Sequence, residues 1–443
     1  MSPPANCDGL LRLNTLADII ASCVNTGSLA STPCQTLFCD ATPGATYSVG
    51  CSTTPDIRDT LAAAQSIARN PANNVAALLA LATPNAPFQP SLSSPPDGWE
   101  IALNYAPSGA NFDGPAAVAL DASGNVFIAN GGGDSVSELT AASGYATGLN
   151  FAPMNAAFDS PVSLALDGSG NVFVANLFGD SVSELTQASS YATGLNFTPG
   201  DAALSEPVAL ALDGSSNVFV ANEFNNSVSE LAAPNYGTSG SNFAPVAASF
   251  DIPMSLALDP SGNIFVANAG GDSVSELTQA SSYATGLNFA PSAAMLSEPV
   301  SLALDGSSNV FVANEFNNSV SELTAPSYGT SGANFASMDA NFNDPISIAL
   351  DGSGNVFVAN GVGNSVSELT AASSYATGLN FAPAGAAFSE PFSVALDGSG
   401  NVFVANLEGN SVSQLIGLAT PVVTPIQSCV AAEASGPSQY CVP

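Results

Sequence analysis

Most of the chain is a succession of short apolar runs that recur in a fixed order. In one copy, residues 162–167 (VSLALD) and 171–176 (NVFVAN) are rich in β-branched and aromatic residues and are separated by Gly-Ser-Gly. This pattern predicts two buried strands joined by a tight hairpin turn. Residues 181–186 (SVSELT) and 191–197 (YATGLNF) are more polar, and they predict a third and a fourth strand on the outside of the same sheet.

The copies form an internal repeat with a constant period. Its frame, P-x-S-L-A-L-D-G-S-G-N-V-F-V-A-N, starts at prolines spaced 46 residues apart without any insertion: Pro115, Pro161, Pro207, Pro253, Pro299, Pro345 and Pro391. A repeat of this length is typical of a four-stranded propeller blade and is too rich in strands for a helical solenoid. The sequence therefore predicts an all-β fold, a seven-bladed β-propeller over residues 99–420.

The two ends of the repeat region predict how the ring closes. The last copy breaks into GLATPVVTP after SVSQL, so its fourth strand is missing. Residues 99–105 (WEIALNY) lie 46 positions before residues 145–151 and match them, with Asn104 aligned to Asn150. We expect this N-terminal strand to complete the last blade, which would leave no exposed sheet edge.

Both flanks of the propeller differ from it in composition. Residues 10–24, 56–69 and 74–82 have the apolar spacing of helices, so residues 1–90 are predicted to form a small α-helical N-terminal cap with disulfides, followed by a Pro- and Ser-rich linker. Residues 421–443 are predicted to be a Pro-rich tail with a cysteine loop.

Cysteines are confined to these flanks. Cys7, Cys23, Cys34, Cys39 and Cys51 precede the repeats, whereas Cys429 and Cys441 follow them. Metal-binding spacings are lacking, so disulfides formed in an oxidising compartment are the better interpretation. We expect Cys429 to pair with Cys441, and Cys23 to pair with Cys34 or Cys39. The first residues do not resemble a secretory signal, but the cysteines favour a secreted or cell-surface protein, with the chain given being mature or truncated.

The charge balance excludes some classes of partner. The chain of 443 residues has a formal charge of -33, no Lys, no His, and only Arg12, Arg58 and Arg69 as cations. Nucleic-acid binding depends on phosphate neutralisation by Lys and Arg, so we expect no nucleic-acid partner. The longest apolar run, residues 75–82, is much shorter than the roughly 20 residues of a membrane-spanning helix, so no membrane insertion is expected. The same composition leaves no large positive charge at low pH, which predicts stability that changes little, or rises, as the pH falls towards 3.

The frame P-x-x-L-A-L-D-x-S-G-N-V-F-V-A-N, followed by N-S-V, resembles the NHL repeat of β-propellers over about residues 99–420. The helical N-terminal segment looks like the leader of secreted bacterial NHL-type proteins. Such propellers are commonly binding platforms, and relatives include streptogramin lyases and calcium-dependent lactonases. The chain departs from the repeat where Asn replaces the usual Asp after V-A, and it has no His to act as the base in lyase chemistry. No catalytic residue is therefore assigned.

Two sets of repeated acids are candidate sites. The D-x-S-G-N turns supply Asp121, Asp167, Asp213, Asp259, Asp305, Asp351 and Asp397. Their oxygen-rich loops make calcium possible, but further acidic ligands do not follow, and turn formation by Asp and Asn is the better interpretation. No other cofactor is expected. The third strands supply Glu138, Glu184, Glu230, Glu276, Glu322 and Glu368, which we expect to be solvated.

The loops between second and third strands vary where the strands do not, and they should surround one mouth of the central channel. Their candidate ligand-binding residues are Phe178, Glu223, Phe224, Glu315, Phe316 and Glu408. The phenylalanines could grip a sugar or a peptide, or they could pack on the next blade. Because the blades are nearly copies, we expect a nearly symmetric mouth and favour an extracellular binding or scaffold protein for a protein or glycan ligand. The alternatives are a calcium-assisted hydrolase or lyase at the channel mouth and a structural surface or matrix component.

Overall fold

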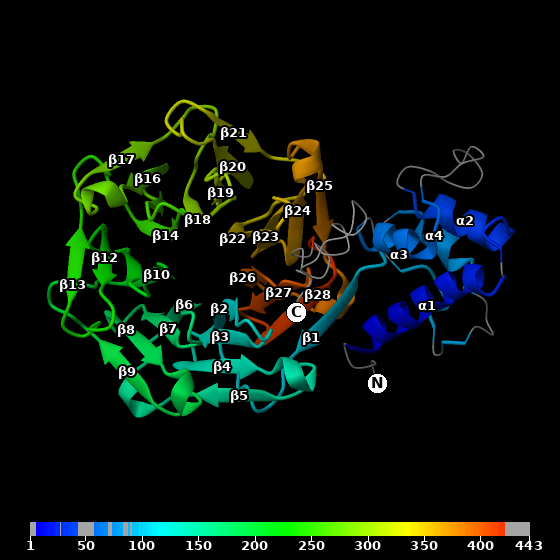
Figure 1. Cartoon of the computed structure of the whole chain (residues 1–443), viewed down its shortest axis with the longest axis horizontal. Coiled ribbons are helices and arrows are strands. Elements are labelled where there is room, and N and C mark those ends of the chain that lie inside the picture. The colour runs from blue at the N-terminus through cyan, green and yellow to red at the C-terminus, as the bar shows by residue number, and fades with distance from the viewer. Residues whose placement is uncertain are drawn as a thin grey trace, which may run out of the picture.

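The computed structural model describes residues 6–26, 28–42, 57–69, 73–82, 87–88, 91–96 and 98–420. Seven four-stranded antiparallel sheets are arranged as blades around a central channel (Figure 1). In each of the first six blades the strand order follows the chain from the centre outwards. The prediction of a seven-bladed β-propeller is confirmed.

The strand bounds repeat with the sequence period. Blades 1 to 3 consist of β2 (Pro115–Leu120), β3 (Val126–Asn130), β4 (Ser135–Leu139), β5 (Gly148–Phe151); β6 (Pro161–Leu166), β7 (Val172–Asn176), β8 (Ser181–Leu185), β9 (Gly194–Phe197); and β10 (Pro207–Leu212), β11 (Val218–Asn222), β12 (Ser227–Leu231), β13 (Gly240–Phe243). Blades 4 to 6 consist of β14 (Pro253–Leu258), β15 (Ile264–Asn268), β16 (Ser273–Leu277), β17 (Gly286–Phe289); β18 (Pro299–Leu304), β19 (Val310–Asn314), β20 (Ser319–Leu323), β21 (Gly332–Phe335); and β22 (Pro345–Leu350), β23 (Val356–Asn360), β24 (Ser365–Leu369), β25 (Gly378–Phe381). Blade 7 consists of β26 (Pro391–Leu396), β27 (Val402–Asn406), β28 (Ser411–Ile416) and β1 (Ile101–Tyr105).

Ring closure follows the predicted route. Strand β1 pairs antiparallel with β28, with Tyr105 opposite Val412 and Asn104 opposite Ser413. The buried Tyr105 hydroxyl also donates a hydrogen bond of 2.6 Å to Oε1 of Gln414. The first propeller strand thus occupies the outer edge of the last blade and joins the two ends of the repeat region.

The core lies between neighbouring blades. Each second strand is buried on both faces, and its Phe packs against Val and Leu side chains of the next blade, as Phe127 does against Val172 and Leu185. A Tyr from the next blade covers this Phe, with the Phe127 and Tyr191 ring centroids 5.2 Å apart in an edge-on arrangement. Such aromatic contacts are favourable beyond the area that they bury.

The third strands are more buried than the sequence predicted. Glu138, Glu184 and Glu368 are less than 10% exposed, and the expectation that the repeated glutamates are solvated is wrong at these positions. The reason is the next blade: Glu138 lies on the same face as Phe127, beside the tyrosine that covers it. Burial raises the pKa of all six glutamates, and the turn aspartate of the same blade raises it further.

A helical segment lies beside the ring, next to β1 and outside the channel (Figure 1). It contains α1 (Asn6–Val24), α2 (Thr32–Asp40), α3 (Thr60–Arg69) and α4 (Val75–Leu79). Sequence periodicity missed α2, because it is short and has a proline, Pro33, at its second position. The described helices include none that is long and apolar enough to cross a membrane.

One disulfide and one buried cation organise this segment. Cys23 is bonded to Cys34, one of the two partners expected for it, and Cys39 is also disulfide-bonded. The expected pair Cys429 and Cys441 lies outside the described residues. Arg12, only 4% exposed, donates a hydrogen bond to the carbonyl of Gly98 and pairs with Glu100 at 3.7 Å. These contacts fix α1 to the chain just before β1.

Candidate functional site

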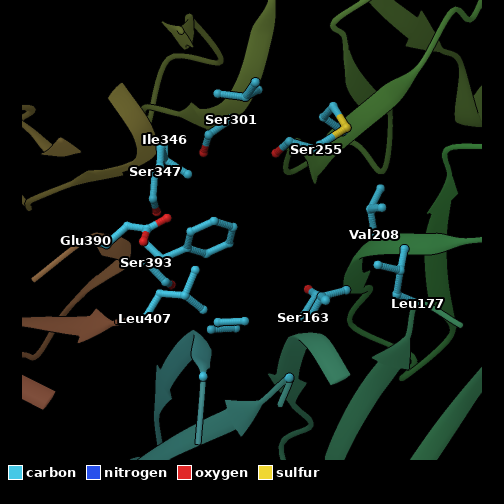
Figure 2. A pocket seen from close by; sticks show the side chains of 18 of the residues that line it. Ser163, Leu177, Val208, Ser255, Ser301, Ile346, Ser347, Glu390, Ser393 and Leu407 are labelled. Atoms are coloured by element: carbon cyan, nitrogen blue, oxygen red, sulfur yellow. The ribbon is translucent and has the colours of Figure 1, made fainter. Parts of the chain in front are cut away.

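One mouth of the channel is an open cavity of about 680 Å³. It lies on the face that carries the loops between second and third strands and the connections from one blade to the next. Figure 2 shows residues from different blades around this common space, among them Ser163, Ser255, Ser301, Val208 and Glu390. A cavity of this volume is in the range of small-molecule and cofactor sites.

An apolar collar surrounds the cavity. The second residue of every first strand contributes to it: Ala116, Val162, Val208, Met254, Val300, Ile346 and Phe392. Leu177 and Leu407, from the loops after β7 and β27, add to the apolar lining. We call these nine residues the collar. Next to them along the strands, serine hydroxyls accept hydrogen bonds from backbone N–H groups of the following blade, as Ser163 does from Leu210 at 3.3 Å.

The residues just above the collar are held in a constrained backbone conformation. The residue before each blade's proline has a positive φ: Gly114, Ser160, Glu206, Ile252, Glu298, Asp344 and Glu390. Its backbone N–H donates a hydrogen bond to the side-chain oxygen of an Asp or Asn. This acceptor ends the loop between the second and third strands of the preceding blade, as Asn364 does for Glu390 at 2.7 Å. Asn410 accepts the equivalent bond from Gly114 and so closes the series around the ring. This left-handed region costs about 1–2 kcal/mol for a residue with a side chain.

Four carboxylates lie at the rim of the cavity, three of them on the neighbouring blades 5, 6 and 7. Glu223, Glu315, Asp344 and Glu390 line the cavity, from blades 3, 5, 6 and 7. Burial raises the pKa of Glu223, and the nearby Glu206 raises it further. Burial likewise raises the pKa of Glu315, with further increases from the Asp344 and Glu298 charges and from a hydrogen bond with Asp344. A cation at this rim would relieve the repulsion between these groups.

The structure separates the six candidate residues into two groups. Glu223 and Glu315 line the cavity. Phe178, Phe224 and Phe316 are 69%, 73% and 74% exposed, and they stand on the loops outside it. The interpretation in which these phenylalanines pack on the next blade is therefore wrong. Glu408 is exposed and does not line the cavity.

Sequence reasoning missed Asp344, Glu390 and the collar. Comparing the residue before each repeated proline, and the residue after it, would have found Asp344, Glu390 and the seven collar residues on the first strands, because these two columns vary in size and charge from blade to blade. They also correct the expectation of a nearly symmetric mouth. Blade 1 contributes only Gly114, Ala116, Ala117, Gly131 and Gly132, which form a notch of small residues between the larger side chains of blades 7 and 2.

The repeated aspartates lie at the opposite mouth and serve the turns. Oδ1 of Asp213 accepts the N–H groups of Ser215 and Asn217 at 2.8 Å, and its Oδ2 accepts the Asn217 side-chain amide. All seven aspartates make the same bonds. Within the described residues, no group of three or more acids or cysteines is placed to hold a metal ion.

The second strand of every blade ends in a buried asparagine. Each is fully buried, and Asn176 donates to the hydroxyls of Ser181 and Ser183 at 3.1 and 2.7 Å. A buried Asp would need a cationic partner, and the chain has no Lys or Arg after Arg69. The neutral amide makes the bonds to the third strand without a charge.

The sequence matches no family model and no curated protein. Several solved structures share the fold. Virginiamycin B lyase from Staphylococcus aureus with quinupristin has a TM-score of 0.59 at 12% identity, over 71% of this chain and 98% of the lyase. YCF48 bound to D1 peptide has a TM-score of 0.54 at 10% identity, over 74% of this chain and 97% of the other. The extracellular domain of BT3049 from B. thetaiotaomicron has a TM-score of 0.54 at 13% identity, over 73% and 41%. Likeness at this level shows the propeller fold alone.

Proposed function

We propose that this chain is an extracellular NHL-type binding propeller, and that a protein or peptide docks on the face that carries the channel mouth. The observation that carries this proposal is the pairing of an open apolar cavity with three phenylalanines on the surrounding loops. Phe178, Phe224 and Phe316 each follow a residue that lines the cavity. Large apolar side chains that remain exposed around a cavity are typical of interaction surfaces.

A protein or peptide is favoured over a glycan by the collar. Its aliphatic side chains offer contacts to apolar groups, whereas sugar sites depend on many polar partners. YCF48, which shares the fold, is a propeller with a bound peptide. The extracellular assignment is supported by the disulfide between Cys23 and Cys34, since disulfides persist in oxidising compartments, and by the extracellular propeller domain of BT3049.

Lyase chemistry is less well supported. A variant of virginiamycin B lyase with alanine in place of one histidine is catalytically inactive, and this chain contains no histidine. The rim acids also lack a Lys or Arg that could stabilise developing charge, because all three arginines precede the propeller.

Selection from a phage-displayed peptide library on the immobilised protein tests this function. The readout is binding of the enriched peptides to the wild type, to a variant with Phe178→Ser, Phe224→Ser and Phe316→Ser, and to a matched control. The control carries Met154→Ser, Val246→Ser and Met338→Ser, which replace side chains exposed by 93–95% on the connections between blades. We expect loss of binding only in the phenylalanine variant. Equal binding to all three proteins would contradict the proposal, and hits confined to a glycan array would replace the peptide by a sugar.

A further inference from the structure

The channel mouth is an apolar site with a negative rim, and this combination defines a class of ligand. We propose that it binds a peptide segment in which an apolar side chain enters the collar while a neighbouring Lys or Arg pairs with the rim carboxylates. The inference rests on the proposed function and names the chemistry that the same site recognises.

The order of the lining residues along the channel axis determines how such a ligand would be oriented. In blade 7, Glu390 precedes the first strand, Phe392 follows two positions further along it, and Ser393 comes next. The same order holds around the ring, so carboxylates lie at the rim and the collar lies below them. A ligand that satisfies both layers has its charge outside and its apolar group inside.

The notch in blade 1 gives the apolar group a place. Gly114, Ala116 and Gly131 leave room there, and the notch is flanked by Phe392 and Leu407 of blade 7 and by Leu177 of blade 2. The collar residues of the other blades are all larger than Ala116. An aliphatic side chain of the ligand that fills the notch would contact apolar groups on three sides.

The rim supplies the complement for a cation. Glu315 and Asp344 face each other across the boundary between blades 5 and 6, close enough to raise the pKa of Glu315. Glu390 lies in the next blade, and Figure 2 shows it at the edge of the same space as Leu407 and Ser393. The propeller sequence after Arg69 contains no Lys or Arg that could neutralise these groups. An Arg side chain fits best, since its planar fork pairs with carboxylates in two contacts.

Fluorescence anisotropy with labelled five-residue peptides tests the inference on the full chain. The probe is Gly-Leu-Arg-Leu-Gly, and the comparison peptides are Gly-Leu-Gln-Leu-Gly, without the charge, and Gly-Gly-Arg-Gly-Gly, without the apolar groups. Because the whole chain is strongly negative, titrations are made at about 0.3 M NaCl, where the screening length between exposed charges is shorter than about 8 Å. We expect the complete probe to bind at least about tenfold more tightly than either comparison peptide.

Three variants locate the binding. Glu315→Gln with Asp344→Asn should weaken binding of the complete probe about tenfold, the effect of losing a charge-assisted pair. Ala116→Phe fills the notch with the residue that blade 7 already carries at the equivalent position, and it should weaken binding without any change of charge. Glu408→Gln removes a charge from an exposed loop position on the same face, and it should leave the affinity within about twofold.

The outcomes separate this inference from the proposed function. Equal binding of the Arg and Gln peptides, or equal weakening by Glu408→Gln and by the Glu315 and Asp344 pair, would overturn the charge recognition. Unchanged binding in Ala116→Phe would overturn the placement of the apolar group. No binding of the complete probe up to about 1 mM would overturn the inference, while peptides selected from the library and lost in the phenylalanine variant would still support the proposed function.

Discussion

Glu368 is a buried acid whose charge works against folding, and its replacement by glutamine is predicted to stabilise the protein. It is 6% exposed and lies between Phe357 and Leu379 on neighbouring strands. At this blade boundary Leu418 and Ala419 pack with Phe357, where the other boundaries have a tyrosine. Burial, together with the charge of Asp351, raises the pKa of Glu368 from 4.5 to about 7.

The magnitude follows from this pKa difference. Below pH 4.5 the Glu368 carboxyl is protonated in both the folded and the unfolded state. Folding then buries no charge, and the contribution of this group to the free energy of unfolding is fully present. As the pH rises through about 7, the unfolded state ionises first and that contribution is lost. A difference of about 2.5 pKa units corresponds to about 3 kcal/mol, or roughly 4 °C in the melting temperature of a domain of this size.

Urea unfolding of the wild type and of Glu368→Gln, followed by circular dichroism at pH 8 and pH 4, measures this effect. Glutamine is compatible with the position, because blade 7 has Gln414 there. We expect Glu368→Gln to be more stable by about 3 kcal/mol at pH 8 and equal to the wild type at pH 4. Glu230→Gln, at a more exposed copy of the position, is the control and should gain less. Equal stability of wild type and Glu368→Gln at pH 8 would mean that the folded state accepts the Glu368 charge without cost, contrary to this prediction.

Three further perturbations test other parts of the structure. The wild type itself should become more stable between pH 8 and pH 4.5 in thermal unfolding, because burial raises the pKa of all six third-strand glutamates; a fall in melting temperature over this interval would contradict that. Glu298→Gly should be more stable than Glu298→Ala by about 1 kcal/mol in urea unfolding, since its φ of +47° favours glycine; the reverse order would remove the argument for backbone strain at the rim. Arg12→Met should destabilise the protein by about 3 kcal/mol by removing the buried ion pair with Glu100 and the hydrogen bond to Gly98, whereas Arg58→Met, at an exposed position, should have little effect; an equally small effect of Arg12→Met would show that the buried pair is not needed.

The sequence was sufficient to predict the closed ring of blades, because a constant repeat period assigns the same strands to every blade. The match between residues 99–105 and the missing fourth strand located β1 and its partner β28 without any structure. The boundaries of the fourth strands were less well predicted. Tyr191 was assigned to a strand, but it precedes β9 with a φ of +60° and packs between blades. Its role depends on the neighbouring blade, which a pattern within one repeat does not contain.

The same limit applies to the site. Glu223 and Glu315 were found because their loops differ visibly from the others, whereas Glu390 and Phe392 sit beside an invariant proline and were hidden by the similarity of their surroundings. The burial of Glu138 and Glu184 could not be predicted from the polar sequence of their strands either, because the next blade covers these side chains. In a propeller, the side chains of one repeat are buried by another, so environment has to be assigned from pairs of repeats.

A crystal structure of the protein with the Gly-Leu-Arg-Leu-Gly peptide would locate the ligand on the propeller. We expect peptide density in the channel mouth, with a leucine in the notch beside Ala116 and Phe392 and the guanidinium near Glu315, Asp344 or Glu390. Peptide bound only on the outer strands, on the helical segment or at the opposite mouth would show that the channel mouth is not the binding site.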